Sequence, residues 1–343
     1  MSGVRKFVAQ VAVLLVIASV AHAVDIQTVT IGNPGNVGEI SGASAPGGYG
    51  PDRVCGAVDY VYAIGKYEVT AGQYTEFLNA VARTDTYGLY NTAMFSDSFG
   101  CRIQRSGSSG SFTYSVAAEW ANRPVNYTNW GDAARFVNWL HNGQPSGVQD
   151  LTTTEDGSYF LNGAVTRAAL LAVVRKPNAT WAIPSEDEWY KAAYHYNDGV
   201  TGHYYNYPTG SDTTPNNGNP EGDTGNTANY YDGDHTIGAP YWRTEVGFFS
   251  LSGGCYGTFD QGGNVWEWNE AVFTGTQGTV RGLRGGSYID VINDFMNAGC
   301  RFDYGRPTHD SMDSGFRVAR VPEPGSLLLL TTSLGLAVRQ VRR

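Results

Sequence analysis

Apolar residues at helical spacing predict two helices in the first half of the chain. One helix follows a capping box of Thr70 and Gln73, and its apolar positions are Tyr74, Phe77, Leu78 and Val81. The other is capped by Asn129 or Asp132, and its apolar positions are Ala133, Phe136, Val137 and Leu140. In both helices these residues recur three and four positions apart, which places them on one helical face.

A third helix and several short strands complete the predicted regular structure. Ser185 and Glu188 form another capping box, which opens a helix at EDEWYKAAY. Residues 58–69 and 109–116 are short runs rich in tyrosine and valine and are interpreted as strands. Residues 195–240 are rich in Gly, Asn, Asp, Thr and Tyr without apolar periodicity. This segment is too long for a plain loop, so it is either disordered or ordered by a bound group such as calcium.

The two ends of the chain carry patterns typical of protein export. Residues 1–23 contain a basic start, an apolar block and the small-residue sequence AHA, which predict a secretory signal peptide. Residues 321–343 contain Pro-Glu-Pro, an apolar run too short for a transmembrane helix, and a basic end. This order is similar to the PEP-CTERM tail that a membrane sorting protease recognises, although a simple hydrophobic tail is the alternative. The chain is therefore expected at the cell surface or in the extracellular matrix of a bacterium.

The composition narrows the possible partners. The chain has 343 residues, with 23 Lys and Arg against 32 Asp and Glu, and its formal net charge is −9. Such an acidic exported chain is not expected to bind nucleic acid or anionic membranes through bulk charge, but it suits divalent cations and neutral glycans. No shift in composition and no internal repeat divides the region between the two sorting signals.

The four cysteines are Cys55, Cys101, Cys255 and Cys300, and no two of them form a CxxC. Two disulfides are the favoured interpretation in an exported chain, rather than a zinc site or a redox pair. Sequence alone allows three connectivities. Because two cysteines lie in each half of the chain, we favour Cys55 with Cys101 and Cys255 with Cys300.

Six sequence blocks occur in a fixed order: IGKYEVTAGQYTEFLNA, RPVNYTNWGDAARFVNWL, WAIPSEDEWYKAAY, YGTFDQGGNVWEWNE, LRGGSY and GFRVAR. Together they resemble the formylglycine-generating enzyme or sulfatase-modifying factor family. The resemblance covers residues 60–320 and leaves residues 24–59 as an N-terminal extension. It implies a single α+β domain, a variant of the C-type lectin fold with much irregular structure.

The resemblance implies a calcium site in the DQGGNVWEW block. Asp260 and Glu267 offer carboxylates, while Gly263 and Val265 offer main-chain carbonyls. Calcium takes about six to eight oxygen ligands, which a glycine-rich turn can supply by mixing carboxylates with backbone. The alternative is that these polar groups only cap turns by hydrogen bonding.

The segment ANYYDGD resembles a second calcium site of the family. It would use Asn229, the carbonyl of Tyr230 and Asp234. The spacing beyond Asn229 departs from the family pattern, and turn capping is again the alternative.

The catalytic positions of the family's namesake enzyme differ in this chain. That enzyme uses two cysteines just beyond the RGGS block to bind copper and to oxidise a substrate cysteine to formylglycine. Asp290 and Phe295 occupy those positions here, and no cysteine lies between Tyr288 and Gly299. Because Cu(I) requires soft thiolate ligands, copper is not expected. Cys300 lies near a family disulfide position, which favours a structural role for it.

Other catalytic signatures are missing from the sequence. The histidines are scattered without metal-binding spacing, and neither GxSxG nor a phosphate-binding loop occurs. We expect a noncatalytic, calcium-stabilised binding module whose aromatic pocket beside Trp266 and Ser287 binds a glycan, a peptide or a surface protein. The alternative is an enzyme of the same fold that uses copper-independent chemistry on an unknown substrate. An open aromatic shelf favours binding, and a narrow, deep pocket favours an enzyme.

Overall fold

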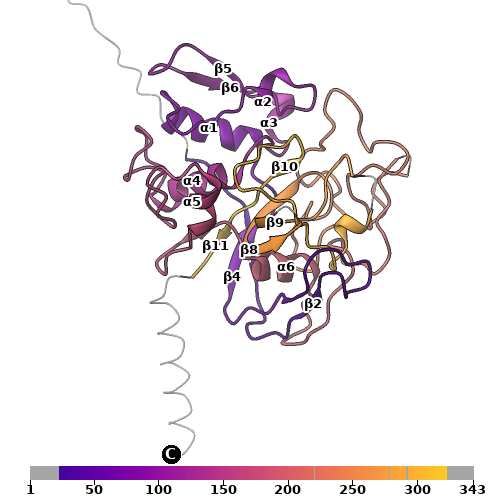
Figure 1. Cartoon of the computed structure of the whole chain (residues 1–343). Helices are drawn as coiled ribbons and strands as arrows, with labels where there is room; N and C mark the ends of the chain where they lie inside the picture. Colours follow the sequence, from indigo (N-terminus) through magenta and orange to yellow (C-terminus); the bar gives the residue numbers. More distant parts are fainter. Residues whose placement is uncertain (1–22, 220, 277, 291–292, 323–343) are drawn as a thin grey trace, which may run out of the picture.

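The computed structural model describes residues 23–219, 221–276, 278–290 and 293–322. Residues 1–22 of the predicted signal peptide and the predicted sorting tail from residue 323 onward lie outside this range. Along the described part of the chain, no helix has both the length and the apolar character that crossing a membrane requires. The described residues form short helices and strands joined by long irregular segments (Figure 1).

Six α-helices are described, and the three longest are those that the sequence predicts. Their bounds are α1 (Ala71–Val81), α2 (Ala93–Ser96), α3 (Ala118–Ala121), α4 (Trp130–His141), α5 (Arg167–Ala172) and α6 (Glu186–Tyr194). The capping boxes at Thr70 and Ser185 are both formed. In α4 the cap is Asn129, and Asp132 completes the box by accepting a hydrogen bond from the backbone N–H of Asn129.

A four-stranded sheet joins the beginning and the end of the described chain. Its strands are β1 (Thr28–Ile31), β4 (Tyr62–Gly65), β11 (Ala319–Arg320) and β7 (Trp181–Ala182), in the order β1-β4-β11-β7. Every neighbouring pair is antiparallel, and Ile64 lies opposite Val29 on one side and Ala319 on the other. The N-terminal extension therefore supplies a strand to the same sheet as the last strand.

A second sheet carries the segment with the tryptophans. Its strands are β10 (Ser314–Gly315), β8 (Trp266–Gly275) and β9 (Gly278–Arg284), with β10 parallel and β9 antiparallel to β8. Figure 1 shows this sheet near the centre of the molecule. The other described elements are the hairpin of β2 (Glu39–Ser41) with β3 (Arg53–Cys55), the hairpin of β5 (Gln104–Ser106) with β6 (Thr113–Ser115), and the 3-10 helix η1 (Asn293–Met296).

The irregular segment 195–240 contains no helix or extended strand in its described part, as its composition predicts. Isolated β-bridges hold it instead, such as those of His195 with Tyr204 and of Tyr207 with Ser211. A further bridge joins Asn229 to Gly263. The segment is thus ordered by local hydrogen bonds and by its contact with the turn before β8.

The main core lies between α1 and α4 and is rich in aromatic rings. It includes Tyr74, Phe77, Phe136, Trp139 and Phe316, all of which are buried. The ring centroids of Phe77 and Phe136 are 5.3 Å apart, and those of Phe136 and Phe316 are 5.4 Å apart. Phe316 directly follows β10, so packing of the two predicted helices also fixes the edge of the central sheet.

Neither predicted disulfide is formed, although all four cysteines lie in the described part of the chain. Cys55 packs in a small cluster with Tyr190 and Tyr204, whereas Cys101 lies in the main core. Cys255 is exposed, whereas Cys300 is buried in the main core. The two cysteines of each predicted pair therefore lie in different environments. The pairing was predicted from the half of the sequence in which each cysteine lies, and this does not determine which cysteines are close in space.

A buried ionic cluster connects α6 with both ends of the fold. The Glu186 carboxylate accepts hydrogen bonds from Arg284 at 2.8 and 3.0 Å and from Arg301 at 2.8 Å on each oxygen. Arg53 on β3 approaches the same carboxylate at 3.2 Å. Burial alone would raise the pKa of Glu186, but Arg284 and Arg301 lower it to about 2. The cluster fixes β3, β9 and the segment before Phe302 relative to the start of α6.

Replacing Glu186 with glutamine should destabilise the fold strongly. The change keeps the size of the side chain but leaves the buried Arg284 and Arg301 without their compensating charge. Breaking a buried ion pair in this way costs about 3–5 kcal/mol, which urea denaturation can measure. Glu76→Gln, an exposed position on α1, is the matched control and should leave the free energy of unfolding almost unchanged.

Because the pKa of Glu186 is lowered, the stability of the fold should decrease at acidic pH. The pKa of Glu186 is about 2 in the fold against 4.5 for an ordinary glutamate, so its contribution is complete above about pH 4.5 and is lost as the pH falls toward 2. Glu186→Gln should flatten this part of the stability profile. Equal stability of the two proteins across that range would contradict the assignment.

Candidate functional site

The turn from Asp260 to Val265 leads into β8 and brings the two predicted calcium segments together. Asp260, Gly263 and Asn264 all have positive φ, at 59°, 76° and 62°, which bends the backbone sharply. The N–H of Asn264 donates to the carbonyl of Asn229 at 2.8 Å. Segments that lie far apart in sequence are therefore adjacent at this turn.

Glu267 and Asp260 are both fixed by hydrogen bonds beneath this turn. Glu267 is fully buried and forms an ion pair with Arg317 at 2.6 Å. The indole N–H of Trp189 donates to the same carboxylate at 2.6 Å. Asp260 accepts a hydrogen bond from the N–H of Gly247 at 2.6 Å. Burial raises the pKa of Asp260 to about 6, and the negative charge of Glu267 adds to the effect.

Glu68, just beyond β4, joins this pair and was missed by the sequence analysis. One of its oxygens accepts a hydrogen bond from Asn264 at 3.0 Å. The other oxygen is buried and has no hydrogen-bond partner among the described residues. Burial raises the pKa of Glu68 well above its usual value, and repulsion by Asp260 raises it further. The available signal was a carboxylate in the YEVT block, within the predicted strand of residues 58–69, in a chain with few charges.

The second predicted segment is only partly assembled around Asn229. Its Nδ2 donates to the carbonyl of Trp242 at 3.1 Å, and its Oδ1 is buried without a hydrogen-bond partner among the described residues. The carbonyl of Tyr230 accepts from a threonine hydroxyl at 3.4 Å. The Asp234 carboxylate accepts instead from the N–H of His235 at 2.8 Å and from Asn219 at 3.4 Å. Asp234 is therefore engaged in an outer turn rather than with Asn229.

The first segment has donor atoms that suit a hard cation. Glu68 and Glu267 are buried and Asp260 is half-buried, and all three carboxylates lie close to a single guanidinium, Arg317. In the described part of the chain, no three His, Cys, Asp or Glu side chains are arranged so that they could hold a metal by themselves. Calcium would thus need the carbonyls of the turn as well, which matches its preference for mixed oxygen ligands. The unpartnered oxygen of Glu68 and the raised pKa of Asp260 are the observations that fit a bound cation.

Asp290 and Phe295, which the family resemblance places at the positions of the catalytic cysteines, form a hydrogen-bonded turn and an aromatic contact. Asp290 accepts hydrogen bonds from the N–H and the hydroxyl of Ser287 at 2.7 and 2.8 Å, which closes the RGGS turn. Burial raises the pKa of Asp290 to about 6. Phe295 packs its ring 5.4 Å from that of Trp266 and 5.9 Å from that of Phe302. Neither side chain offers a thiolate.

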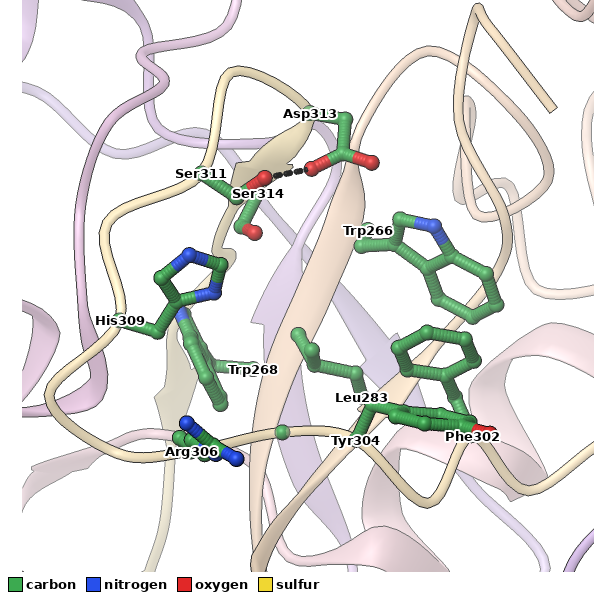
Figure 2. Close-up of a pocket in the computed structure, with 11 residues that line it drawn as sticks. Trp266, Trp268, Leu283, Phe302, Tyr304, Arg306, His309, Ser311, Asp313 and Ser314 are labelled. Carbon is green, nitrogen blue, oxygen red and sulfur yellow. Dashed lines mark hydrogen bonds between the residues drawn. The ribbon is translucent and has the colours of Figure 1, made fainter. Parts of the chain in front are cut away.

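Trp266 also lines a groove with a volume of 360 Å³. Figure 2 shows Trp266 beside Phe302 on one side, His309, Trp268 and Arg306 on the other, and Ser311 with Asp313 at the top. The rings of Trp266 and Phe302 are stacked at 4.4 Å. Tyr304 is 42% exposed and presents its ring at the edge. Trp266 lines this groove, whereas Ser287 is fully buried against Asp290.

The sequence profile of the sulfatase-modifying factor enzyme 1-like domain matches residues 56–322. The chain belongs to this family, and its fold is the single α+β domain of the formylglycine-generating type that the sequence analysis expects. A bovine protein named inactive C-alpha-formylglycine-generating enzyme 2 is 32% identical over 146 residues, which are 40% of this chain and 43% of that protein. The match thus spans less than half of that relative's length.

Solved structures with low sequence identity are similar in fold. Variable protein 1 of Treponema denticola has a TM-score of 0.50 and 19% identity, covering 88% of this chain and 97% of its own. A protein named CarF has a TM-score of 0.49 and 19% identity, covering 87% of this chain and 99% of its own. At such identity, the likeness to the Treponema protein shows the fold alone.

Replacing Asp290 with asparagine should change how stability depends on pH. The pKa of Asp290 is about 6 in the fold against 3.8 for an ordinary aspartate, so wild-type stability should rise as the pH falls from about 6 toward 4. Asparagine keeps an acceptor for Ser287 and removes the charge. We expect the variant to be more stable by about 3 kcal/mol at neutral pH and close to wild type near pH 4.

Thermal unfolding at several pH values measures this effect. Asp25→Asn, at an exposed position, is the control and should follow the wild-type profile. A variant that is less stable than wild type at neutral pH would show that the ionised Asp290 is a favourable part of the fold.

Proposed function

We propose that the chain is a noncatalytic, calcium-stabilised binding module, displayed outside a bacterial cell, whose aromatic groove binds a glycan. The observation that carries the proposal is the 360 Å³ groove, in which Trp266, Phe302 and Tyr304 lie opposite His309 and beside Asp313. Pockets that bind small ligands typically combine aromatic walls with a few polar groups and have volumes of about 300–1,000 Å³. This groove falls near the lower end, which suits one or two sugar rings rather than a large cofactor.

The chemistry of the lining supports a sugar. A sugar ring has a face of C–H groups that can lie on an aromatic ring, and hydroxyls at its edge that both donate and accept hydrogen bonds. Asp313 provides acceptors, while His309 and Ser311 provide groups that donate or accept. A peptide or a surface protein remains the competing ligand, and the binding experiment below includes it.

The residues at the family's catalytic positions support a noncatalytic role. Asp290 and Phe295 supply no soft ligand for Cu(I), and Asp290 is occupied in closing the turn at Ser287. One relative in the comparison bears the word inactive in its name. Binding can persist on a scaffold whose original reaction has been lost, because fold does not determine activity.

Calcium is proposed as the structural cofactor of this module. Asp260, Glu267 and Glu68 would supply carboxylate oxygens, with the carbonyls of Gly263 and Val265 completing the set. The cation would offset the burial and the carboxylate repulsion that together raise the pKa of Asp260 and of Glu68. It would thereby fix the turn that leads directly into Trp266.

A second candidate function is an enzyme with copper-independent chemistry. Asp290 is the observation that favours it, because a carboxyl with a pKa of about 6 is suited to general acid–base work near neutral pH. Shortening of a bound glycan by wild type but not by Asp290→Asn would support this reaction. Recovery of the glycan intact after long incubation would exclude it.

Removing calcium should lower the thermal stability of the folded protein. A ligand that binds only the native state stabilises it by about 2.7 kcal/mol when present at ~100 times its Kd, so added calcium should raise the melting temperature and excess chelator should lower it. Glu68→Gln should reduce this calcium-dependent increment and should make the calcium-free protein more stable, since one buried charge is gone. Glu119→Gln, at an exposed position, is the control. A melting temperature that is identical in calcium and in chelator would refute the cofactor.

Truncating Tyr304 should weaken glycan binding without unfolding the protein. Tyr304→Ala removes a half-exposed ring from the groove, and we expect at least about a tenfold loss of affinity, which corresponds to ~1.4 kcal/mol. Tyr205→Ala is the control, because Tyr205 is partly exposed and stacks on Tyr196 outside the groove. Arrays of neutral oligosaccharides and of peptides, probed with both variants and wild type, measure the effect. Binding of peptides alone would overturn the glycan assignment.

A further inference from the structure

A second cavity adjoins the aromatic groove and is larger, with a volume of 620 Å³. Phe302 and Tyr304 line both cavities, so these two rings separate them. Tyr49 and Phe295 provide further ring surface in the second cavity. Its remaining wall is built from Cys300 and from small residues of the N-terminal extension, Ala43, Ala45, Gly47 and Gly48.

The small-residue wall is a loop, residues 42–50, that is held tightly against the end of the domain. The N–H of Tyr49 donates to the carbonyl of Gly299 at 3.2 Å, and its carbonyl accepts from the N–H of Arg301 at 2.8 Å. A Cβ atom at Gly50 would lie 2.1 Å from the carbonyl oxygen of Arg301, so this approach requires glycine. The wall is therefore positioned by backbone contacts on both sides of Cys300.

The loop does not belong to the region that defines the family. The family profile matches residues 56–322, and the loop ends before that region begins. The first cavity, in contrast, is lined only by residues within it. The second cavity thus combines residues of the matched region with a wall that lies outside it.

The two cavities differ in the charge of the residues that line them. The first includes His309 and Asp313 among its lining residues, whereas none of the described residues that line the second has a charged side chain. The hydroxyl of Tyr49 donates to Asp303 at 3.0 Å, which fixes its ring as part of the wall. The second cavity is therefore a slot between backbone and aromatic rings.

We infer that the two cavities are subsites of one binding groove, and that the groove takes a linear, neutral oligosaccharide with the loop 42–50 forming the second subsite. This inference rests on the glycan-binding function proposed above. A linear sugar chain repeats the same ring along its length, so one ring can occupy each side of the Phe302 and Tyr304 ridge. The slot offers ring faces and backbone hydrogen-bonding groups without charge, which suits a neutral ring and disfavours an anionic one.

The dependence of affinity on chain length tests the inference. The probes are linear neutral glucans, xylans, mannans and galactans, each as a series from the monosaccharide to the octasaccharide. Calorimetric titration of the protein with each sugar measures the affinity. We expect affinity to rise by at least about tenfold between the monosaccharide and the oligomer that fills both subsites, and then to level off. The same affinity at every length would overturn the second subsite while leaving glycan binding intact.

Two substitutions separate the subsites. Ala43→Trp, at an exposed position, should fill the second cavity and reduce the affinity for long oligomers to that for the monosaccharide, which it should bind like wild type. Tyr49→Ala should have the same effect by removing a wall, and its circular dichroism spectrum reports whether the fold is kept. Val174→Trp, at a position that is 75% exposed and lies outside both cavities, is the matched control.

The possible outcomes distinguish failure of the second subsite from failure of glycan binding itself. Unchanged oligomer binding by Ala43→Trp would refute the second subsite alone. Failure of every sugar in the four series to bind would refute the proposed function, and binding of peptides instead would refute both.

Discussion

The buried carboxylate of Glu186 constrains the parts of the molecule on which the groove depends. It is shared by Arg284 at the end of β9, by Arg301 one residue before Phe302, and by Arg53 on β3. Charges that are removed from water must be compensated at close range, so the buried Arg284 and Arg301 both depend on this carboxylate, and the partly exposed Arg53 adds to the cluster from β3. The ring of Phe302 takes its position from this requirement, and so does the approach of the N-terminal hairpin.

Local features of the fold could be predicted from the sequence, because their causes are local. Thr70, Asn129 and Ser185 each cap a helix through residues at most three positions away, and the structure forms all three caps. The block around Trp266 supplies two of the rings that line the groove, Trp266 and Trp268, whereas Phe302 and Tyr304 come from another part of the chain. The family blocks added the fold class, because their order carries information that no single helix or strand contains.

Features that depend on long-range contacts could not be predicted in this way. Glu68 reaches the turn at Asn264 across 196 positions of sequence, and nothing in its own segment specifies that contact. The predicted disulfide pairs are wrong for the same reason, because cysteines that follow one another along the chain, such as Cys55 and Cys101, are buried in different clusters. The second cavity depends on the hydrogen bond between the backbone of Tyr49 and that of Gly299. The spacing of residues in the sequence does not indicate this contact.

The short connection from β10 to β11 has a mechanical consequence. Only residues 316–318 separate the strand beside the groove from the strand at the end of the domain, and Arg317 in the middle is tied to Glu267 on β8. Force applied between a ligand in the groove and a tether beyond Arg320 would run through these few residues rather than through the helices. It would also act along β11, which is hydrogen-bonded on both sides by β4 and β7. Those bonds would then be loaded in shear and would have to break together.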